Sequence, residues 1–136
     1  MDISIYNGTR QKISGSALRY AADKFGREMN MARRSVSVAL VGERRIRELN
    51  RRYRGLNKVT DILSFAQRKG AYLGELVICY QQVKRQAKRR RVSASSELVF
   101  IFIHGLLHLA GYNDDTLSGW REMERIGTRL CKSLHR

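Results

Sequence analysis

Residues 98–115 decide the fold of this chain and read Leu-Val-Phe-Ile-Phe-Ile-His-Gly-Leu-Leu-His-Leu-Ala-Gly-Tyr-Asn-Asp-Asp. Positions 98–110 are almost wholly apolar, and a helix that is apolar on every side is typical of the centre of a globular fold. Ser93 or Ser95 can cap the start of this helix, and Gly111 can end it by turning the chain back. The apolar run has 13 residues, which is too short to span a bilayer and suits a buried helix.

Two histidines interrupt the apolar helix, and a polar group in a buried helix needs a partner. His104 and His108 are four residues apart, so they lie on one helix face, where two imidazoles can bind one metal ion. A turn at Gly111 can bring Asp114 or Asp115 round to face them. We therefore predict a divalent metal site, with zinc as the ion, in which one of these acids is the third ligand. The alternative is a pair of hydrogen-bonded core histidines.

The ligand spacing of this site is H-x-x-x-H-x-x-G-x-x-D, which is that of the metzincin proteases with Asp114 in place of their third histidine. This spacing favours Asp114 as the third ligand and leaves Asp115 as the alternative. Gly105 stands where those proteases carry a catalytic glutamate, so a zinc peptidase is disfavoured. Three protein ligands leave one coordination position open, as a catalytic zinc requires.

Hydrophobic periodicity on either side of this helix predicts the remaining elements. We expect strands over 3–6, 35–41, 61–66 and 74–80, and helices over 16–29, 43–54, 82–91, 94–110 and 116–134. The inward side chains of the helices over 43–54 and 116–134 are expected to be Ile46, Leu49, Tyr53, Trp120, Met123, Ile126, Leu130 and Leu134. This order predicts an α/β (α+β) fold, with a small mixed four-stranded sheet and about five helices in one domain over residues 1–136.

The charge of the chain points to a polyanionic partner. There are 27 Lys and Arg residues against 12 Asp and Glu residues, which gives a net charge of +15. Nucleic acid is the commonest partner of such a surface, and a merely solvated basic surface is the alternative. We expect no membrane partner. The isolated Cys79 and Cys131, and an N-terminus without an apolar leader, are typical of reduced cysteines in a cytoplasmic protein.

Four segments together resemble the YbeY family of metal-dependent endoribonucleases, which are rRNA maturation factors. Residues 104–112, His-Gly-Leu-Leu-His-Leu-Ala-Gly-Tyr, are similar to the family's H-G-x-L-H-L-x-G-Y-D-H motif. The segments 53–55 (Tyr-Arg-Gly), 60–65 (Thr-Asp-Ile-Leu-Ser-Phe) and 74–78 (Gly-Glu-Leu-Val-Ile) are similar to further family motifs. The chain departs from the first motif after Tyr112, where Asn-Asp replaces Asp-His and makes the expected third ligand an aspartate. It also carries Val59 and Ala66 where the family usually has prolines, which loosens the backbone there.

This resemblance implies a zinc-dependent endoribonuclease that prefers single-stranded RNA and acts in rRNA maturation, 16S rRNA 3′-end processing and ribosome quality control. One zinc ion per chain would be held by His104, His108 and Asp114, and a carboxylate ligand would also admit other divalent metals. Arg54 would stabilise charge on the phosphate, and Asp115 is the candidate general base. The implied partners are ribosomal RNA, the small ribosomal subunit and ribosome-associated proteins. The alternative is a non-catalytic RNA-binding ribosome-assembly factor with a structural or vestigial metal site.

Overall fold

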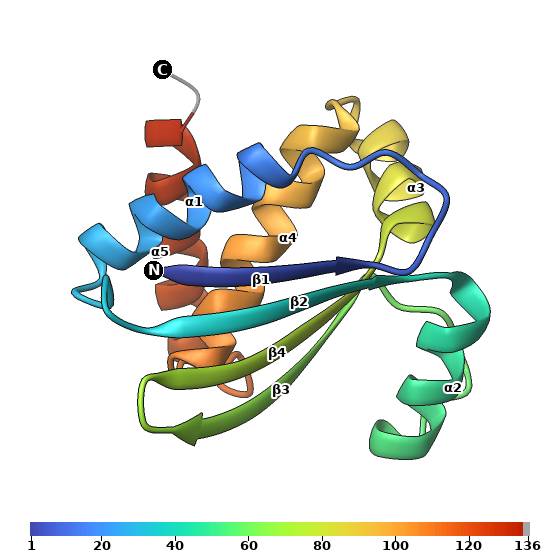
Figure 1. Ribbon diagram of the computed structural model, residues 1–136, viewed down its shortest axis with the longest axis horizontal. Helices are drawn as coiled ribbons and strands as arrows, with labels where there is room; N and C mark the ends of the chain where they lie inside the picture. Colours follow the sequence, from blue (N-terminus) through green and yellow to red (C-terminus); the bar gives the residue numbers. More distant parts are fainter. Residues whose placement is uncertain (135–136) are drawn as a thin grey trace.

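A computed structural model describes residues 1–134 of the chain, and Figure 1 shows helices packed around a single sheet. The elements in order are β1 (Asp2–Asn7), α1 (Gly15–Glu28), β2 (Ser35–Val41), α2 (Glu43–Arg54), β3 (Ile62–Lys69), β4 (Tyr72–Cys79), α3 (Tyr80–Arg90), α4 (Ala94–Leu109) and α5 (Leu117–Leu134). The predicted α/β fold with a mixed four-stranded sheet and five helices is confirmed over these residues.

The sheet has the strand order β1-β2-β4-β3 (Figure 1). β1 and β4 both pair with β2 in parallel, whereas β3 pairs with β4 as an antiparallel neighbour. Helix α1 connects the parallel strands β1 and β2, because parallel neighbours need a long crossover connection. The antiparallel pair β3–β4 is closed by a short turn at Gly70, whose φ of 61° suits glycine.

The two faces of the sheet are covered by different helices, because alternate residues of a strand point to opposite sides. On β4, Leu76 and Ile78 face the main core with α1, α4 and α5. Val77 and Cys79 face the other way and pack with Ile46 of α2 in a smaller cluster. Helix α2 therefore covers one end of the opposite face. Its last residue, Arg54, lies next to β3, the edge strand of the sheet.

Helix α4 is the centre of the main core, as its apolar sequence predicted. Ten of its sixteen residues are buried. Gly105 lies directly on the sheet, since a Cβ atom added there would lie 2.7 Å from Ile62 Cδ1 and 2.9 Å from Leu76 Cδ2. This close approach holds the face of α4 that carries the histidines at a fixed height above β3 and β4.

Four predictions about the elements need correction. Helix α3 starts at Tyr80, directly after β4, rather than at position 82. Strands β3 and β4 extend to Lys69 and Tyr72 because they continue pairing up to the turn. Trp120 is 47% exposed because it lies in the first turn of α5, which follows an exposed loop. Tyr53 is 58% exposed and only touches the edge of Phe65, at 5.3 Å between ring centroids.

Within residues 1–134, no single helix is both long and apolar enough to cross a bilayer, and α3 with α4 meets that test only as a pair bent by 112°.

Cys79 is buried and Cys131 is half-buried, and both are free thiols. Burial raises the pKa of both thiols, which keeps them protonated and unreactive.

Candidate metal centre

One face of α4 is partly exposed to solvent, whereas the rest of the helix from Glu97 to Leu109 is buried. From Glu97 to Leu109, the half-exposed residues are Phe100, His104 and His108, each separated from the next by four positions. The side chains of His104 and His108 are 26% and 29% exposed, and their ring centroids are 5.2 Å apart. The predicted pair on one helix face is therefore present, and it faces outward from the core into a pocket.

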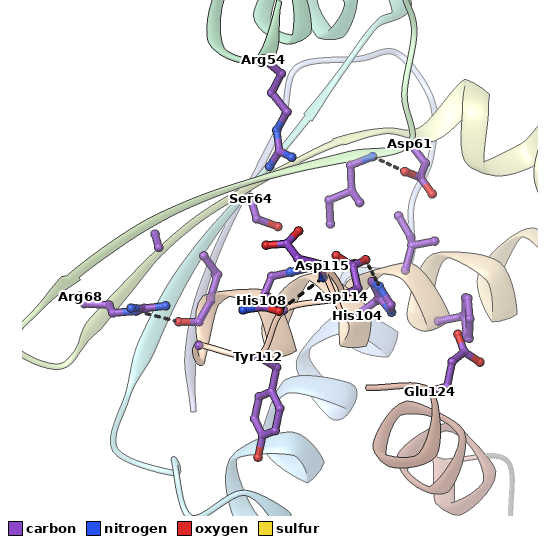
Figure 2. A pocket seen from close by; sticks show the side chains of 17 residues that line it. Arg54, Asp61, Ser64, Arg68, His104, His108, Tyr112, Asp114, Asp115 and Glu124 are labelled. Atoms are coloured by element: carbon purple, nitrogen blue, oxygen red, sulfur yellow. Dashed lines mark hydrogen bonds and ion pairs between the residues drawn. The ribbon is translucent and has the colours of Figure 1, made fainter. Parts of the chain in front are cut away.

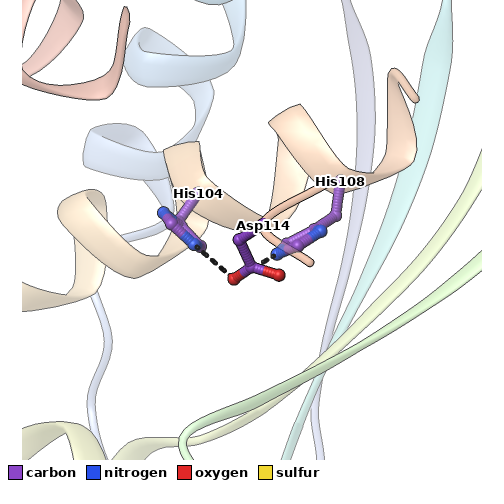
Figure 3. Close-up of side chains that lie close together, drawn as sticks. All are labelled: His104, His108 and Asp114. Carbon is purple, nitrogen blue, oxygen red and sulfur yellow. Dashed lines mark ion pairs between the residues drawn. The ribbon is translucent and has the colours of Figure 1, made fainter. Parts of the chain in front are cut away.

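The chain then turns back and places an acid against this pair. Gly111 has a φ of 106°, and the Tyr112 N–H donates to the Leu107 carbonyl at 3.0 Å, which ends the helix and reverses the chain. As a result, Asp114 Oδ2 lies 3.9 Å from His104 Nε2 and 3.8 Å from His108 Nε2 (Figure 3). Of the two acids that the sequence left open, the structure groups Asp114 with the histidines, while Asp115 also lines the pocket.

The three side chains fit the requirements of a divalent metal ion. One ligand atom from each of His104, His108 and Asp114 lies within 4.8 Å of the other two. The carboxylate is too far from either imidazole for a hydrogen bond, which needs a separation below about 3.2 Å. A tetrahedral zinc ion, with bonds of about 2.0–2.2 Å, holds its ligand atoms roughly 3.4 Å apart. The separations of 3.8 and 3.9 Å between the carboxylate and the two imidazoles are wider than this, so the side chains would move closer together to bind one ion.

The surroundings of His108 favour the protonation state that a metal ligand needs. Its pKa is lowered, chiefly by partial burial of the ring and next by the neighbouring His104, while Asp114 opposes both effects. A lowered pKa keeps the imidazole of His108 neutral near pH 7, and the neutral ring has a free lone pair for a metal ion.

The pocket around the three side chains has a volume of about 770 Å³ (Figure 2). Arg54 reaches it from the end of α2, where Gly55 adopts a left-handed conformation with a φ of 69° and ends the helix. The predicted site residues Arg54, His104, His108, Asp114 and Asp115 thus all line one pocket, although they come from α2, α4 and the loop after α4.

Asp61, Ser64, Arg68 and Glu124 also line the pocket, and the sequence did not predict them as site residues. Ser64 and Ala66 lie two positions apart on β3 and both line the pocket, so the period-two pattern of the strand could have indicated the side of Ser64, whereas a register irregularity between Ala66 and Lys69 interrupts this pattern before Arg68. Arg68 has a positive φ of 49°, and its Nε donates to the Leu109 carbonyl at 3.5 Å. Glu124 comes from α5, and no spacing in the sequence indicates that this helix reaches the pocket.

The charges that line the pocket favour a cation. Two arginines, Arg54 and Arg68, oppose four carboxylates, those of Asp61, Asp114, Asp115 and Glu124. With the histidines neutral, the lining therefore carries a net charge of −2, which a single divalent ion offsets. An RNA phosphate would meet this negative lining unless a cation were bound, so cation binding and phosphate binding are expected to be coupled.

The fold and the pocket define a class of small α/β protein in which two helix histidines and a nearby carboxylate could hold a divalent cation. A family model described as endoribonuclease YbeY matches residues 2–135. The chain belongs to the YbeY family, as the resemblance of its motifs predicted.

Individual relatives agree with the family model over most of the chain. Endoribonuclease YbeY of Anaeromyxobacter sp. (strain Fw109-5) is 35% identical over 128 residues, which are 91% of this chain and 67% of that protein. Endoribonuclease YbeY of Syntrophus aciditrophicus (strain SB) is 34% identical, over 85% of this chain and 77% of that protein. The solution structure of TM1509 from Thermotoga maritima matches with a TM-score of 0.71 and 27% identity, over 97% of this chain and 88% of that one.

Proposed function

We propose that this protein is a zinc-dependent endoribonuclease that cleaves single-stranded regions of ribosomal RNA. The observation that carries the proposal is the position of His104, His108 and Asp114, which lie together in one pocket with Arg54 in a chain of the YbeY family. The names of the relatives support RNA cleavage. We infer the metal from the chemistry of the site and ribosomal RNA as the substrate from the family.

His104, His108 and Asp114 are the residues that would hold the ion. A bound zinc ion supplies Lewis acidity toward a phosphoryl oxygen. Two neutral imidazoles and one carboxylate are a common ligand set of catalytic zinc, and the carboxylate also suits harder divalent metals. We infer one ion per chain, because among residues 1–134 this is the one group of His, Cys, Asp and Glu side chains close enough to share an ion.

Arg54 would bind the phosphate whose ester bond is cleaved. Its guanidinium is exposed at the end of α2 and points toward the pocket (Figure 2), and its planar fork suits two phosphate oxygens at once. Charge that develops on those oxygens in the transition state would be stabilised there. Arg68 lines the same pocket from β3, so a bound RNA strand could be held between Arg54 and Arg68.

Asp115 is the proposed general base. It lines the pocket beside Asp114 but is not grouped with the histidines, so its carboxylate stays available to accept a proton from the attacking hydroxyl group. The other pocket carboxylate near the chain reversal, Asp114, would be occupied by the ion. The roles of the two neighbouring acids therefore separate into a ligand and a base.

The substrate class follows from the surface and the pocket. Helix α2 and residues 84–91 carry half of the exposed arginines and lysines among residues 1–134, and such groups hold an RNA backbone without reading its bases. A site inside a pocket admits a single strand more easily than an intact duplex. We infer from the family that the substrate is rRNA, with 16S rRNA 3′-end processing and ribosome quality control in the cytoplasm as the role. The partners would be the small ribosomal subunit and ribosome-associated proteins.

A second candidate function is a non-catalytic ribosome-assembly factor that binds RNA around a structural or vestigial metal site. The observation that favours it is Asp114, a 40% exposed carboxylate in the position where the family motif carries a histidine. The two functions predict the same RNA binding and differ in cleavage.

Cleavage of a labelled single-stranded rRNA fragment separates these functions. Wild-type protein and the His104→Ala/His108→Ala double variant are purified identically and compared with added zinc. We expect the wild type to cleave the RNA and the double variant to bind it without cleavage. Equal cleavage by both proteins would identify a contaminating nuclease and refute the proposed activity. Binding without cleavage by both would support the assembly factor.

A further inference from the structure

A second cavity adjoins the pocket that holds the candidate metal centre. It has a volume of about 280 Å³ and lies between α3 and α4. The two cavities share Asp61, Phe100 and Ile101 in their linings. A chain that occupies the larger pocket can therefore continue past Phe100 into the smaller one without leaving the surface of the protein.

Arg90 lines the smaller cavity and packs on Phe100, which lines both cavities. Its Cζ lies 4.5 Å from the centroid of the Phe100 ring, so the guanidinium covers one face of the ring. Its Nη1 lies 3.0 Å from Oε1 of Glu97, whose side chain is only 2% exposed. The side chain of Arg90 is itself 50% exposed. One side of the guanidinium is thus packed on Phe100, while the rest remains open to the cavity and solvent.

Glu97 makes a further polar contact with Gln86, but its ion pair with Arg90 does not have the geometry of a hydrogen bond. Gln86 Nε2 donates both to Glu97 Oε2 at 3.2 Å and to Asp61 Oδ2 at 3.1 Å, which links the buried acid to the lining of the larger pocket. Glu97 Oε1 has no hydrogen-bond partner, although Arg90 Nη1 is close enough to pair with it. The orientation of the guanidinium therefore follows the ring of Phe100 rather than the lone pairs of the carboxylate.

An ion pair of this kind contributes little to stability on its own. Burial of a carboxylate costs free energy, and its attraction to a half-exposed arginine offsets only part of this desolvation cost. What the arrangement does achieve is a guanidinium that lies over an aromatic ring beside the pocket. A flat guanidinium on an aromatic ring is a surface on which an unpaired nucleobase can stack.

We propose that Arg90, supported by Phe100 and Glu97, is a stacking platform for the nucleobase next to the cleaved phosphate. Phe100 and His104 are one helical turn apart, with ring centroids separated by 6.4 Å, so a neighbouring nucleotide of a bound strand reaches the platform. This inference rests on the proposed function, since it requires a single strand in the larger pocket. It adds a base subsite, which selects unpaired nucleotides because a paired base cannot turn onto the guanidinium.

The first test uses the wild-type protein alone and does not depend on any variant. A series of RNAs is made in which one abasic nucleotide is moved stepwise across the bond that the protein cleaves. The platform predicts that cleavage falls by about tenfold when the abasic position is next to that bond, since one base stack contributes roughly 1–3 kcal/mol. Equal cleavage of every RNA in the series would overturn the platform.

The second test measures RNA binding by zinc-loaded protein in a stopped-flow instrument, at times before cleavage proceeds. The probe is a short single-stranded RNA with one 2-aminopurine, whose fluorescence is quenched by stacking. Arg90→Lys keeps the positive charge beside Glu97 but removes the flat guanidinium. We expect this variant to lose the quenching at one probe position and to bind about tenfold more weakly.

The matched control is Arg27→Lys in the last turn of α1, since Arg27 lines neither cavity and the same charge is conserved. Quenching and affinity should match the wild type in this control. If Arg90→Lys behaves like Arg27→Lys, then Arg90 acts only as a charge and the proposal is wrong. Thermal unfolding of both variants checks the fold, and if Arg90→Lys is unfolded, the abasic series decides alone.

The outcome of these tests separates the platform from the proposed function. A wild type that neither cleaves nor binds single-stranded RNA would remove the function and the platform together. A wild type that cleaves RNA but tolerates an abasic nucleotide at every position would remove only the platform.

Discussion

At the scale of single residues, Asp114 and Asp115 have different expected roles although they are neighbours. Asp114 Oδ2 lies within 3.9 Å of Nε2 of both histidines, whereas Asp115 is not part of that group. The sequence predicted one acid at this position and favoured Asp114 from its spacing. It could not exclude Asp115, because the direction of either side chain depends on the turn at Gly111, which only the folded chain defines.

Substitution of each acid by its amide separates the two roles. Asp114→Asn should weaken zinc binding by at least about tenfold, since even residues that only support a ligand contribute 10–100-fold to affinity. Asp115→Asn should bind zinc as the wild type does and should cleave RNA more slowly. Zinc affinity is measured by competition with a chromophoric chelator. Weaker zinc binding by Asp115→Asn, with Asp114→Asn unchanged, would reverse the assignment.

Arg54 is expected to act on the phosphate and not on the fold. The residue is exposed at the end of α2, so Arg54→Ala should leave the melting temperature unchanged. Cleavage should fall by about 10²–10³-fold, which is typical for loss of one group that stabilises transition-state charge. Arg27→Ala is the control, because Arg27 lies in the last turn of α1, outside both basic segments, and does not line the pocket. Full activity in Arg54→Ala would refute the role.

At the scale of elements, the period of the apolar residues was enough to predict the order and type of the helices and strands. The central position of α4 followed from its composition, because no other element could bury so many apolar side chains. The pocket could not be predicted to the same extent. Arg68 and Glu124 reach it from β3 and α5 through tertiary packing, and neither the strand pairing nor the docking of α5 on α4 is encoded in a local pattern.

The start of α4 offers a test of how firmly the metal-bearing helix is anchored. Ser93 Oγ accepts a hydrogen bond from the Ser96 N–H at 3.0 Å, so Ser93, and not Ser95, is the N-cap. Ser93→Ala should lower the free energy of unfolding by about 1 kcal/mol, the usual contribution of such a cap. Ser95→Ala is the control and should have little effect. Urea unfolding monitored by circular dichroism measures both, and equal stabilities would contradict the assignment of the cap.

At the scale of the whole molecule, the charge of the surface and the charge of the pocket have opposite signs. The chain carries a net charge of +15, whereas the ionised side chains that line the pocket sum to −2. The surface is therefore expected to attract RNA at long range, while the pocket admits a phosphate only after a cation is bound.

This division predicts two different responses of RNA binding. The affinity of metal-free protein for single-stranded RNA should fall steeply between 50 and 200 mM salt, because each phosphate contact releases a counterion. Zinc should increase the affinity by an amount that persists at the higher salt concentration, since the ion acts locally in the pocket. Fluorescence anisotropy over a salt series measures both effects. An affinity that does not change with salt would show that the net charge has no part in RNA binding.

The most direct measurement of the central claim is a zinc titration of metal-stripped protein, followed by the rate of single-stranded RNA cleavage. Cleavage should be absent without metal, rise linearly with added zinc and reach its plateau at one ion per chain. The His104→Ala/His108→Ala variant should remain inactive throughout the titration. Cleavage by wild-type protein that is independent of zinc, or that rises equally in the double variant, would contradict the account.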